Sequence, residues 1–286
     1  MTIPIFHVDA FAEEPFAGNP AAVCLLGEER PESWMQAVAS EMNLSATAFV
    51  RQMDRGYELR WFTPAAEIAL CGHRTLAAAH VMWAENVVER AEPLRFQTKS
   101  GILTCEHTGD IIELDFPATP PTEAVPPPGL FDALHVGPGF AGKSRFDYFV
   151  MVESEEIVRS LKPDLHALRG IPGIRGVIVT STSQNPRYDF VSRFFAPGAG
   201  IDEDPVTGSA HCSLAPFWSE RLGKSAMTAF QASKRGGTVR VRVKGDRVVL
   251  GGKATGILRG ELADHHARPS PATRDTGGLD LSRLFC

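Results

Sequence analysis

Two short segments, far apart in the chain, combine glycine with side chains that can move protons. The first is Cys71-Gly72-His73, and the second is Asp204-Pro205-Val206-Thr207-Gly208-Ser209. A thiol, an imidazole and a carboxylate are the groups that most often exchange protons with a substrate. Cys71, His73 and Asp204 are therefore candidate catalytic residues for a proton transfer.

In both segments the glycine stands where a helix is expected to begin. The first turn of a helix has unpaired N–H groups that attract an anion, and a glycine lets a ligand approach the backbone closely. Gly72 and Gly208, with Thr207 and Ser209, are thus candidate binding residues for a small carboxylate. The same N–H groups would stabilise the enolate that forms when an α-proton leaves.

Each of these residues also has a purely structural interpretation. A single histidine or aspartate at a helix start is more often a cap than a catalyst, and a cysteine among apolar residues is often an inert small hydrophobe. A helix N-terminus lowers a thiol pKa, so both interpretations stay open for Cys71. The Gly18-Asn19-Pro20 sequence is explained by a turn alone, and Asp9 is either a cap or a cleft residue.

An internal repeat favours the functional interpretation. The run YELRWF leads through Thr63-Pro64 to the first segment and then to an alanine-rich helix. The run YDFVSRFF leads through Ala196-Pro197 to the second segment and then to another helix of small residues. Two duplicated lobes are expected, with the active site in the cleft between them.

Apolar runs of strand type dominate the rest of the chain. These runs are IPIFHVDAF, AAVCLL, YELRWF, IIELDF, DYFVMV, GVIVTS, YDFVSRFF, TVRVRV and RVVLGG. Helices are predicted over residues 32–42, 75–86, 157–168 and 209–222. The pattern predicts an α+β protein with mostly antiparallel sheets.

A proline-rich segment, PATPPTEAVPPPGL, cannot continue a strand ladder or a helix. It predicts an N-terminal lobe over residues 1–117 and a C-terminal lobe over 118–278. The last residues, 279–286, follow a second cluster of proline and glycine and are expected to pack on the first lobe.

Composition excludes several classes of function. The 286 residues carry a net charge of −5, which argues against a nucleic-acid partner. No apolar run reaches the roughly 20 residues of a membrane span, and a cytoplasmic location is expected. The five cysteines form no CxxC pair and the nine histidines no metal-binding spacing, so we predict neither a disulfide framework nor a metal site.

The sequence resembles the PhzF-like proteins of phenazine biosynthesis, which have a diaminopimelate-epimerase-like fold. The stretches that carry the resemblance are HVDAFAEEPFAGNPAAVCLL, MNLSATAFV, LRWFTPAAEIALCGHRTLAAAH and RFFAPGAGIDEDPVTGSAH. The resemblance implies that each lobe is a curled, barrel-like antiparallel sheet around a central helix. It also implies a homodimer that needs no cofactor, and an isomerase that moves a proton or double bond in a small carboxylate.

One position departs from the family pattern. The family has a catalytic glutamate in an Asn-Leu-Ser-Glu-Thr motif, whereas this chain has Asn43-Leu44-Ser45-Ala46-Thr47. By resemblance, His73, Asp204 and Ser209 hold the substrate and assist the proton shift. Gly72 and Gly208 correspond to the carboxylate-binding turns, and Ser45, Thr207 and Asn19 are further candidate binding residues.

Ala46 leaves three alternatives to the standard isomerase open. The first is an epimerase or dehydratase that uses Cys71, because racemases of this fold have a cysteine there and Thr207 matches the position of their second cysteine. The second is a non-catalytic protein that binds a metabolite or a partner. The third is an ordinary isomerase inactivated by a deliberate substitution.

Overall fold

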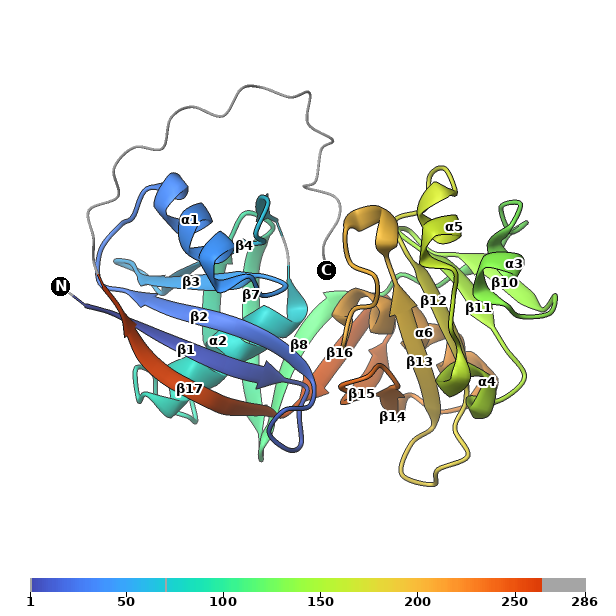
Figure 1. The fold of residues 1–286 in the computed structure, drawn as a ribbon. Coiled ribbons are helices and arrows are strands. Elements are labelled where there is room, and N and C mark those ends of the chain that lie inside the picture. Colours follow the sequence, from blue (N-terminus) through green and yellow to red (C-terminus); the bar gives the residue numbers. More distant parts are fainter. Residues whose placement is uncertain (1, 70, 264–286) are drawn as a thin grey trace. The chain divides into compact units, whose positions relative to one another are not determined.

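The computed structural model describes residues 2–69 and 71–263, and these form two compact units (Figure 1). Within the described residues, unit 1 contains 2–16, 20–69, 71–114 and 253–263, and unit 2 contains 17–19 and 115–252. Each unit has its own curled sheet and its own central helix. The α+β class expected from the sequence is confirmed.

The sheet of unit 1 surrounds helix α2 (Gly72–Ala84), and helix α1 (Glu32–Met42) lies outside it. Neighbouring strands follow the order β17-β1-β2-β3-β4-β6-β7-β8, with the short β5 on β4. Their bounds are β1 Ile3–Ala10, β2 Asn19–Leu26, β3 Thr47–Gln52, β4 Tyr57–Phe62, β5 Glu67–Ile68, β6 Leu94–Thr98, β7 Gly101–Thr108, β8 Ile111–Pro117 and β17 Ala254–Leu262.

The sheet of unit 2 surrounds helix α6 (Gly208–Leu222) in the same manner. Its strands follow the order β9-β10-β11-β12-β13-β14-β15-β16. Their bounds are β9 Thr122–Glu123, β10 Phe140–Lys143, β11 Tyr148–Met151, β12 Val177–Thr182, β13 Phe190–Phe195, β14 Ala226–Gln231, β15 Gly237–Lys244 and β16 Arg247–Gly252. The smaller helices are α3 Leu130–Leu134, α4 Glu155–Ser160, α5 Leu165–Gly170 and the 3₁₀ turn Pro197–Ala199.

Strand directions confirm the internal repeat. In unit 1, β2 is parallel to β3, β3 antiparallel to β4, β4 parallel to β6, and β6 and β8 antiparallel to β7. In unit 2 the same succession runs from β11 to β16. The parallel pairs β4–β6 and β13–β14 flank the central helices, because a parallel connection needs a crossover that a hairpin cannot supply.

The two central helices are buried around most of their circumference, which explains their small side chains. Ala77, Ala78 and Ala79 on α2 are all fully buried, as are Leu214 and Ala215 on α6. A helix that is apolar on all sides must lie inside its domain, and small residues let the surrounding strands approach its backbone.

The structure corrects two details of the sequence interpretation. The helix predicted over residues 157–168 is two helices, α4 and α5, separated at Lys162-Pro163 because proline cannot continue the α4 ladder. Strand β17 pairs with β1 and so belongs to unit 1, although the sequence boundaries placed it in the C-terminal lobe. The prediction for residues 279–286 concerns residues outside those described.

Candidate active site

Helix α2 begins at the first predicted segment. Cys71 is its N-cap residue, with an extended backbone (φ −153°) and no side-chain cap hydrogen bond. The Thr75 amide and hydroxyl both donate to the Cys71 carbonyl, at 3.1 and 2.5 Å. Gly72 is the first helical residue, as expected for the glycine of this segment, although the predicted range 75–86 began three residues later and ended two residues beyond Ala84.

The Cys71 sulfur lies beside two basic side chains of the same turn. Arg74 Nη1 donates to Cys71 Sγ at 2.8 Å, and His73 Nδ1 is 3.7 Å from the sulfur. Cys71 is fully buried, and the exposed fractions are 6% for His73 and 2% for Arg74. Within the described part of the chain, His73 Nε2 and Arg74 Nε make no hydrogen bond. This turn therefore concentrates buried positive and titratable groups around one sulfur atom.

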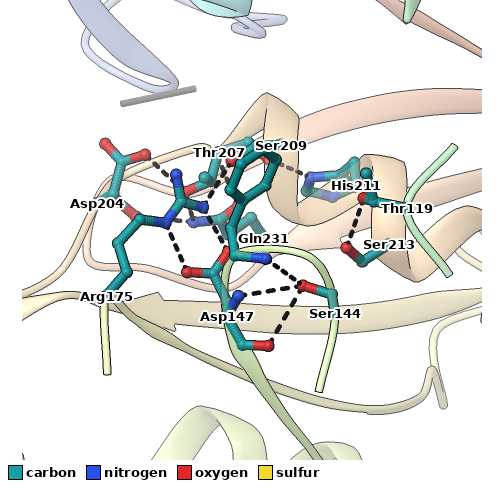
Figure 2. Close-up of polar contacts among 11 residues, drawn as sticks. Thr119, Ser144, Asp147, Arg175, Asp204, Thr207, Ser209, His211, Ser213 and Gln231 are labelled. Carbon is teal, nitrogen blue, oxygen red and sulfur yellow. Dashed lines mark hydrogen bonds and ion pairs between the residues drawn. The ribbon is translucent and has the colours of Figure 1, made fainter. Parts of the chain in front are cut away.

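Helix α6 begins at the second segment, and its turn is held by a network of neutral donors around a carboxylate (Figure 2). Asp204 accepts hydrogen bonds from Thr207 Oγ1 at 2.5 Å and from Asn19 Nδ2 at 2.8 Å. Gln231 accepts from the Thr207 amide at 2.9 Å and donates to the Asp204 carbonyl at 2.7 Å. The start of β2 and the end of β14 thus fix the turn from two directions.

Arg175, Asp147 and Ser209 form a second polar group at the same helix end (Figure 2). Arg175 pairs with the buried Asp147 carboxylate and also donates to Ser209 Oγ at 3.3 Å. Since Arg175 has only donors, the Ser209 oxygen accepts this bond. Arg175 therefore does not use the Ser209 hydroxyl hydrogen, which can be donated to another group.

The next turn of α6 carries a buried histidine that the sequence analysis did not single out. His211 is fully buried, and its Nδ1–H donates to the Thr207 carbonyl at 2.8 Å. Burial lowers the pKa of His211 to about 4, so its imidazole is neutral near pH 7. His211 therefore supports the turn that carries Thr207.

Three other cysteines behave as packing residues. Burial raises the pKa of Cys24 and Cys105, and it raises that of Cys212 to about 12. These neutral thiols contrast with Cys71, which has a guanidinium at hydrogen-bond distance.

Ala46 and Ser45 lie in unit 1, between the end of α1 and the start of β3. Ala46 is fully buried and presents only a methyl group. The Ser45 hydroxyl donates a long hydrogen bond of 3.4 Å to the Pro20 carbonyl. Strand β3 packs against α2, the helix that begins after Cys71.

The structure adds polar residues that sequence reasoning missed. The sequence did contain an indication for Arg74, because a cation in the first turn of a helix is unusual there: it opposes the helix dipole. Gln231 and Arg175 had none, since each reaches the α6 turn from a strand or loop distant in sequence.

Two searches of the described residues were negative. No three His, Cys, Asp or Glu side chains there lie close enough to hold a metal ion. No helix in the same range is both long and apolar enough to cross a membrane.

Comparison with known proteins identifies the family to which these two turns belong. The family model described as "Phenazine biosynthesis-like protein" matches residues 8–260. An uncharacterised isomerase of Halalkalibacterium halodurans is 51% identical, over 92% of this chain and 99% of its own length. A crystal structure of a PhzF-family phenazine biosynthesis protein from Enterococcus faecalis shares 43% identity and a TM-score of 0.88, covering 92% of this chain and 100% of that one.

A more distant likeness concerns the fold alone. A hydroxyproline epimerase from Agrobacterium vitis has 11% identity and a TM-score of 0.59, over 91% of this chain and 92% of that one. The repeated sheet around a central helix is thus shared beyond the close relatives. With the family model covering both helix N-termini, the chain belongs to the phenazine biosynthesis-like, PhzF-type family.

Proposed function

We propose that this protein is a cofactor-independent isomerase that shifts a proton, and with it a double bond, in a small cyclic or amino-acid-like carboxylate. The observation that carries the proposal is the pair of equivalent helix N-termini, one in each unit, each with a glycine and buried proton-transfer groups. Relatives named as isomerases support the reaction class.

The proposed binding groups are the backbone N–H groups after Gly72 and Gly208. Each set could bind a carboxylate or stabilise an enolate, since first-turn N–H groups have no intrahelical partner. Ser209 joins them through its hydroxyl hydrogen, which Arg175 leaves available. Ser45 remains a predicted binding residue.

The polar network at α6 gives its members distinct proposed roles. Asp204 is a proposed acid or base, held by Asn19 and Thr207. Because the Asn19 amide donates to Asp204 and to the Val206 carbonyl, its contacts favour a positioning role over direct binding. Thr207 acts in the same way through its hydroxyl.

The proposal requires a base other than residue 46. Where the resemblance places a glutamate, this chain has the buried methyl group of Ala46. The groups that remain for proton transfer are Cys71, His73 and Asp204. The second candidate function is a non-catalytic protein that binds a metabolite or partner, and Ala46 is the observation that favours it.

The test is solvent-deuterium incorporation into a panel of small carboxylates. The parent chain is compared with Ala46→Glu and Cys71→Ala, and Cys212→Ala serves as the matched cysteine control. We expect measurable exchange by the parent and a gain of roughly 10²–10⁴-fold in Ala46→Glu, the usual contribution of a positioned acid or base.

Three other outcomes of this experiment would lead to different conclusions. Absence of exchange by both the parent and Ala46→Glu would contradict the isomerase proposal. Ligand binding by calorimetry without exchange would support the non-catalytic alternative. Loss of exchange in Cys71→Ala but not in Cys212→Ala would assign the proton transfer to Cys71.

Two finer features of the protein stay predictions. We propose that it forms a homodimer, which sedimentation equilibrium would test, and that it acts in the cytoplasm, which fractionation of its source cells would test.

A further inference from the structure

Arg74 is a buried cation in an unfavourable position. It is the third residue of α2, where the helix dipole already places partial positive charge, and it is 2% exposed. The first turn of α2 contains no acidic residue. A buried charge is costly unless an opposite charge or several hydrogen bonds compensate it.

No carboxylate supplies this compensation within the described residues. Arg74 takes part in none of their ion pairs, and its Nε makes no hydrogen bond. Its one hydrogen bond there is from Nη1 to Cys71 Sγ, at 2.8 Å. A guanidinium is always charged near neutral pH and has no acceptor atom, so the anion must come from the sulfur or from a bound molecule.

The surroundings of Cys71 favour the sulfur. A thiol is a weak acceptor and a thiolate a strong one, and helix N-termini and neighbouring cations both favour the thiolate. Two of these influences act on Cys71, namely the start of α2 and Arg74 at 2.8 Å, and His73 Nδ1 lies 3.7 Å from the sulfur. Burial of the sulfur acts in the opposite direction, so the nearby guanidinium must outweigh it.

We propose that Cys71 is a thiolate at neutral pH, held by Arg74 as its buried counter-ion, and that this pair provides the base that Ala46 cannot. The second part rests on the proposed function. Arg74 is then a positioning residue, and Cys71 is the group that meets the substrate.

The proton balance of the step is complete. The thiolate removes a proton from a carbon next to the substrate carboxylate, so that a C–H bond breaks and an S–H bond forms. The electron pair stays on the substrate as an enolate. The thiol then returns its proton to another carbon, which restores the thiolate and leaves the isomer.

Several charged groups on the strands around α2 have partners of their own. The helix packs against β1, β3, β7 and β17. On these strands, Asp9 accepts the Phe16 amide, Arg51 pairs with Glu58, and Arg259 pairs with Glu85. The remaining titratable side chains of these strands are His7, Cys105, Glu106, His107 and Glu261. Any of these that ionises with pH would modulate the Cys71 titration.

The experiment is a pH titration of thiolate absorbance at 240 nm, which requires neither substrate nor access of a reagent to the buried sulfur. The parent minus Cys71→Ala difference isolates one cysteine. Among the described residues the background is low because burial keeps Cys24, Cys105 and Cys212 protonated, and the contribution of any further cysteine cancels in the difference. We expect a difference of one thiolate at pH 7.

Arg74 variants test the counter-ion. In Arg74→Gln the midpoint of the Cys71 titration should rise by about 1–3 pH units, the usual effect of losing an adjacent opposite charge. Arg74→Lys should restore most of the shift. Circular dichroism verifies that each variant folds. If Arg74→Gln does not fold, the difference spectrum between the parent and Cys71→Ala tests for the thiolate by itself, and Cys71→Ser serves as a second reference protein.

Two results would overturn the inference: equal absorbance of the parent and Cys71→Ala at pH 7, or an unchanged midpoint in a folded Arg74→Gln protein. The first result would mean that the anion for Arg74 comes from a bound molecule, and the second that Arg74 does not stabilise a thiolate at Cys71. The titration is independent of turnover. A normal thiol with deuterium exchange retained refutes only this inference, whereas a thiolate without exchange refutes only the proposed function.

Discussion

The N-terminal turns of α2 and α6 occupy equivalent places in two units of the same topology, yet their polar groups differ in kind. At α6, the carboxylate of Asp204 accepts hydrogen bonds from the Asn19 amide and the Thr207 hydroxyl, and Gln231 donates to the Asp204 backbone carbonyl. At α2, a buried guanidinium contacts a sulfur, and no acidic residue lies in the turn.

This difference teaches that a duplicated backbone does not require duplicated electrostatics. Both turns offer the same first-turn N–H groups, because these follow from helix geometry alone. The shape of the α6 turn is stabilised by a hydrogen-bond network. In the α2 turn, by contrast, the buried Arg74 guanidinium requires an anion, and the neighbouring group that can supply it is the Cys71 sulfur. Substitutions in the two turns should therefore lower the free energy of unfolding by different amounts.

The largest expected effect is on the α2 turn. Cys71→Ala would leave the Arg74 guanidinium without its partner and should lower the free energy of unfolding by about 3–5 kcal/mol. Cys212→Ala, which removes a neutral buried thiol from α6, should cost only about 1–2 kcal/mol. Urea denaturation measures both.

A double variant makes this comparison sharper. Cys71→Ala with Arg74→Met removes both partners, and it should recover roughly half or more of the loss because no unpaired charge remains. Additive losses in the double variant would show that the pair is not coupled.

The next effect concerns acid stability of the α6 turn. Because the folded-state pKa of His211 is lowered to about 4, the unfolded chain binds a proton between pH 6.5 and 4 that the folded chain does not. Stability from this group is therefore lost as pH falls through that window, by up to about 3 kcal/mol.

Denaturation midpoints measured at several pH values check this effect. His211→Asn keeps a donor for the Thr207 carbonyl but does not titrate, so its stability should depend less on pH. The exposed His135, which bonds the Lys162 carbonyl in a similar way, provides the control variant His135→Asn. Equal slopes for both variants and the parent would contradict the assignment.

A smaller effect is expected at the centre of the network. Asp204→Asn keeps the shape of the side chain but replaces one acceptor by a donor, so Asn19 or Thr207 loses its partner. The loss in unfolding free energy should be about 1–3 kcal/mol. Thermal denaturation measures it, and no change would mean that the network does not hold the turn.

The smallest effect is expected at Ser209. Its hydrogen bond from Arg175 is long, at 3.3 Å, so Ser209→Ala should change stability by about 0.5 kcal/mol or less. Its effect on ligand affinity should be larger if its hydroxyl binds substrate. Isothermal calorimetry with a carboxylate found in the exchange screen measures the change in affinity, which is then compared with the change in stability.

Local sequence determined much of the architecture. Alternating apolar runs gave the strands, small residues after Gly72 and Gly208 gave the buried helices, and the repeat of these elements gave the two units. These features depend on local periodicity and on the conformational demands of glycine and proline, which a single sequence displays. Cys71, Gly72, Thr207 and Gly208 were placed correctly at the helix starts for the same reason.

Only the tertiary structure decided which distant side chains meet. Gln231 reaches the α6 turn because β14 is parallel to β13, and Asn19 reaches it from the start of β2. No local pattern marks such contacts, since they depend on strand order and register. Likewise, the sequence shows Arg74 three residues after Cys71, but burial makes that spacing important, because only in a low-dielectric interior does a guanidinium require a partner.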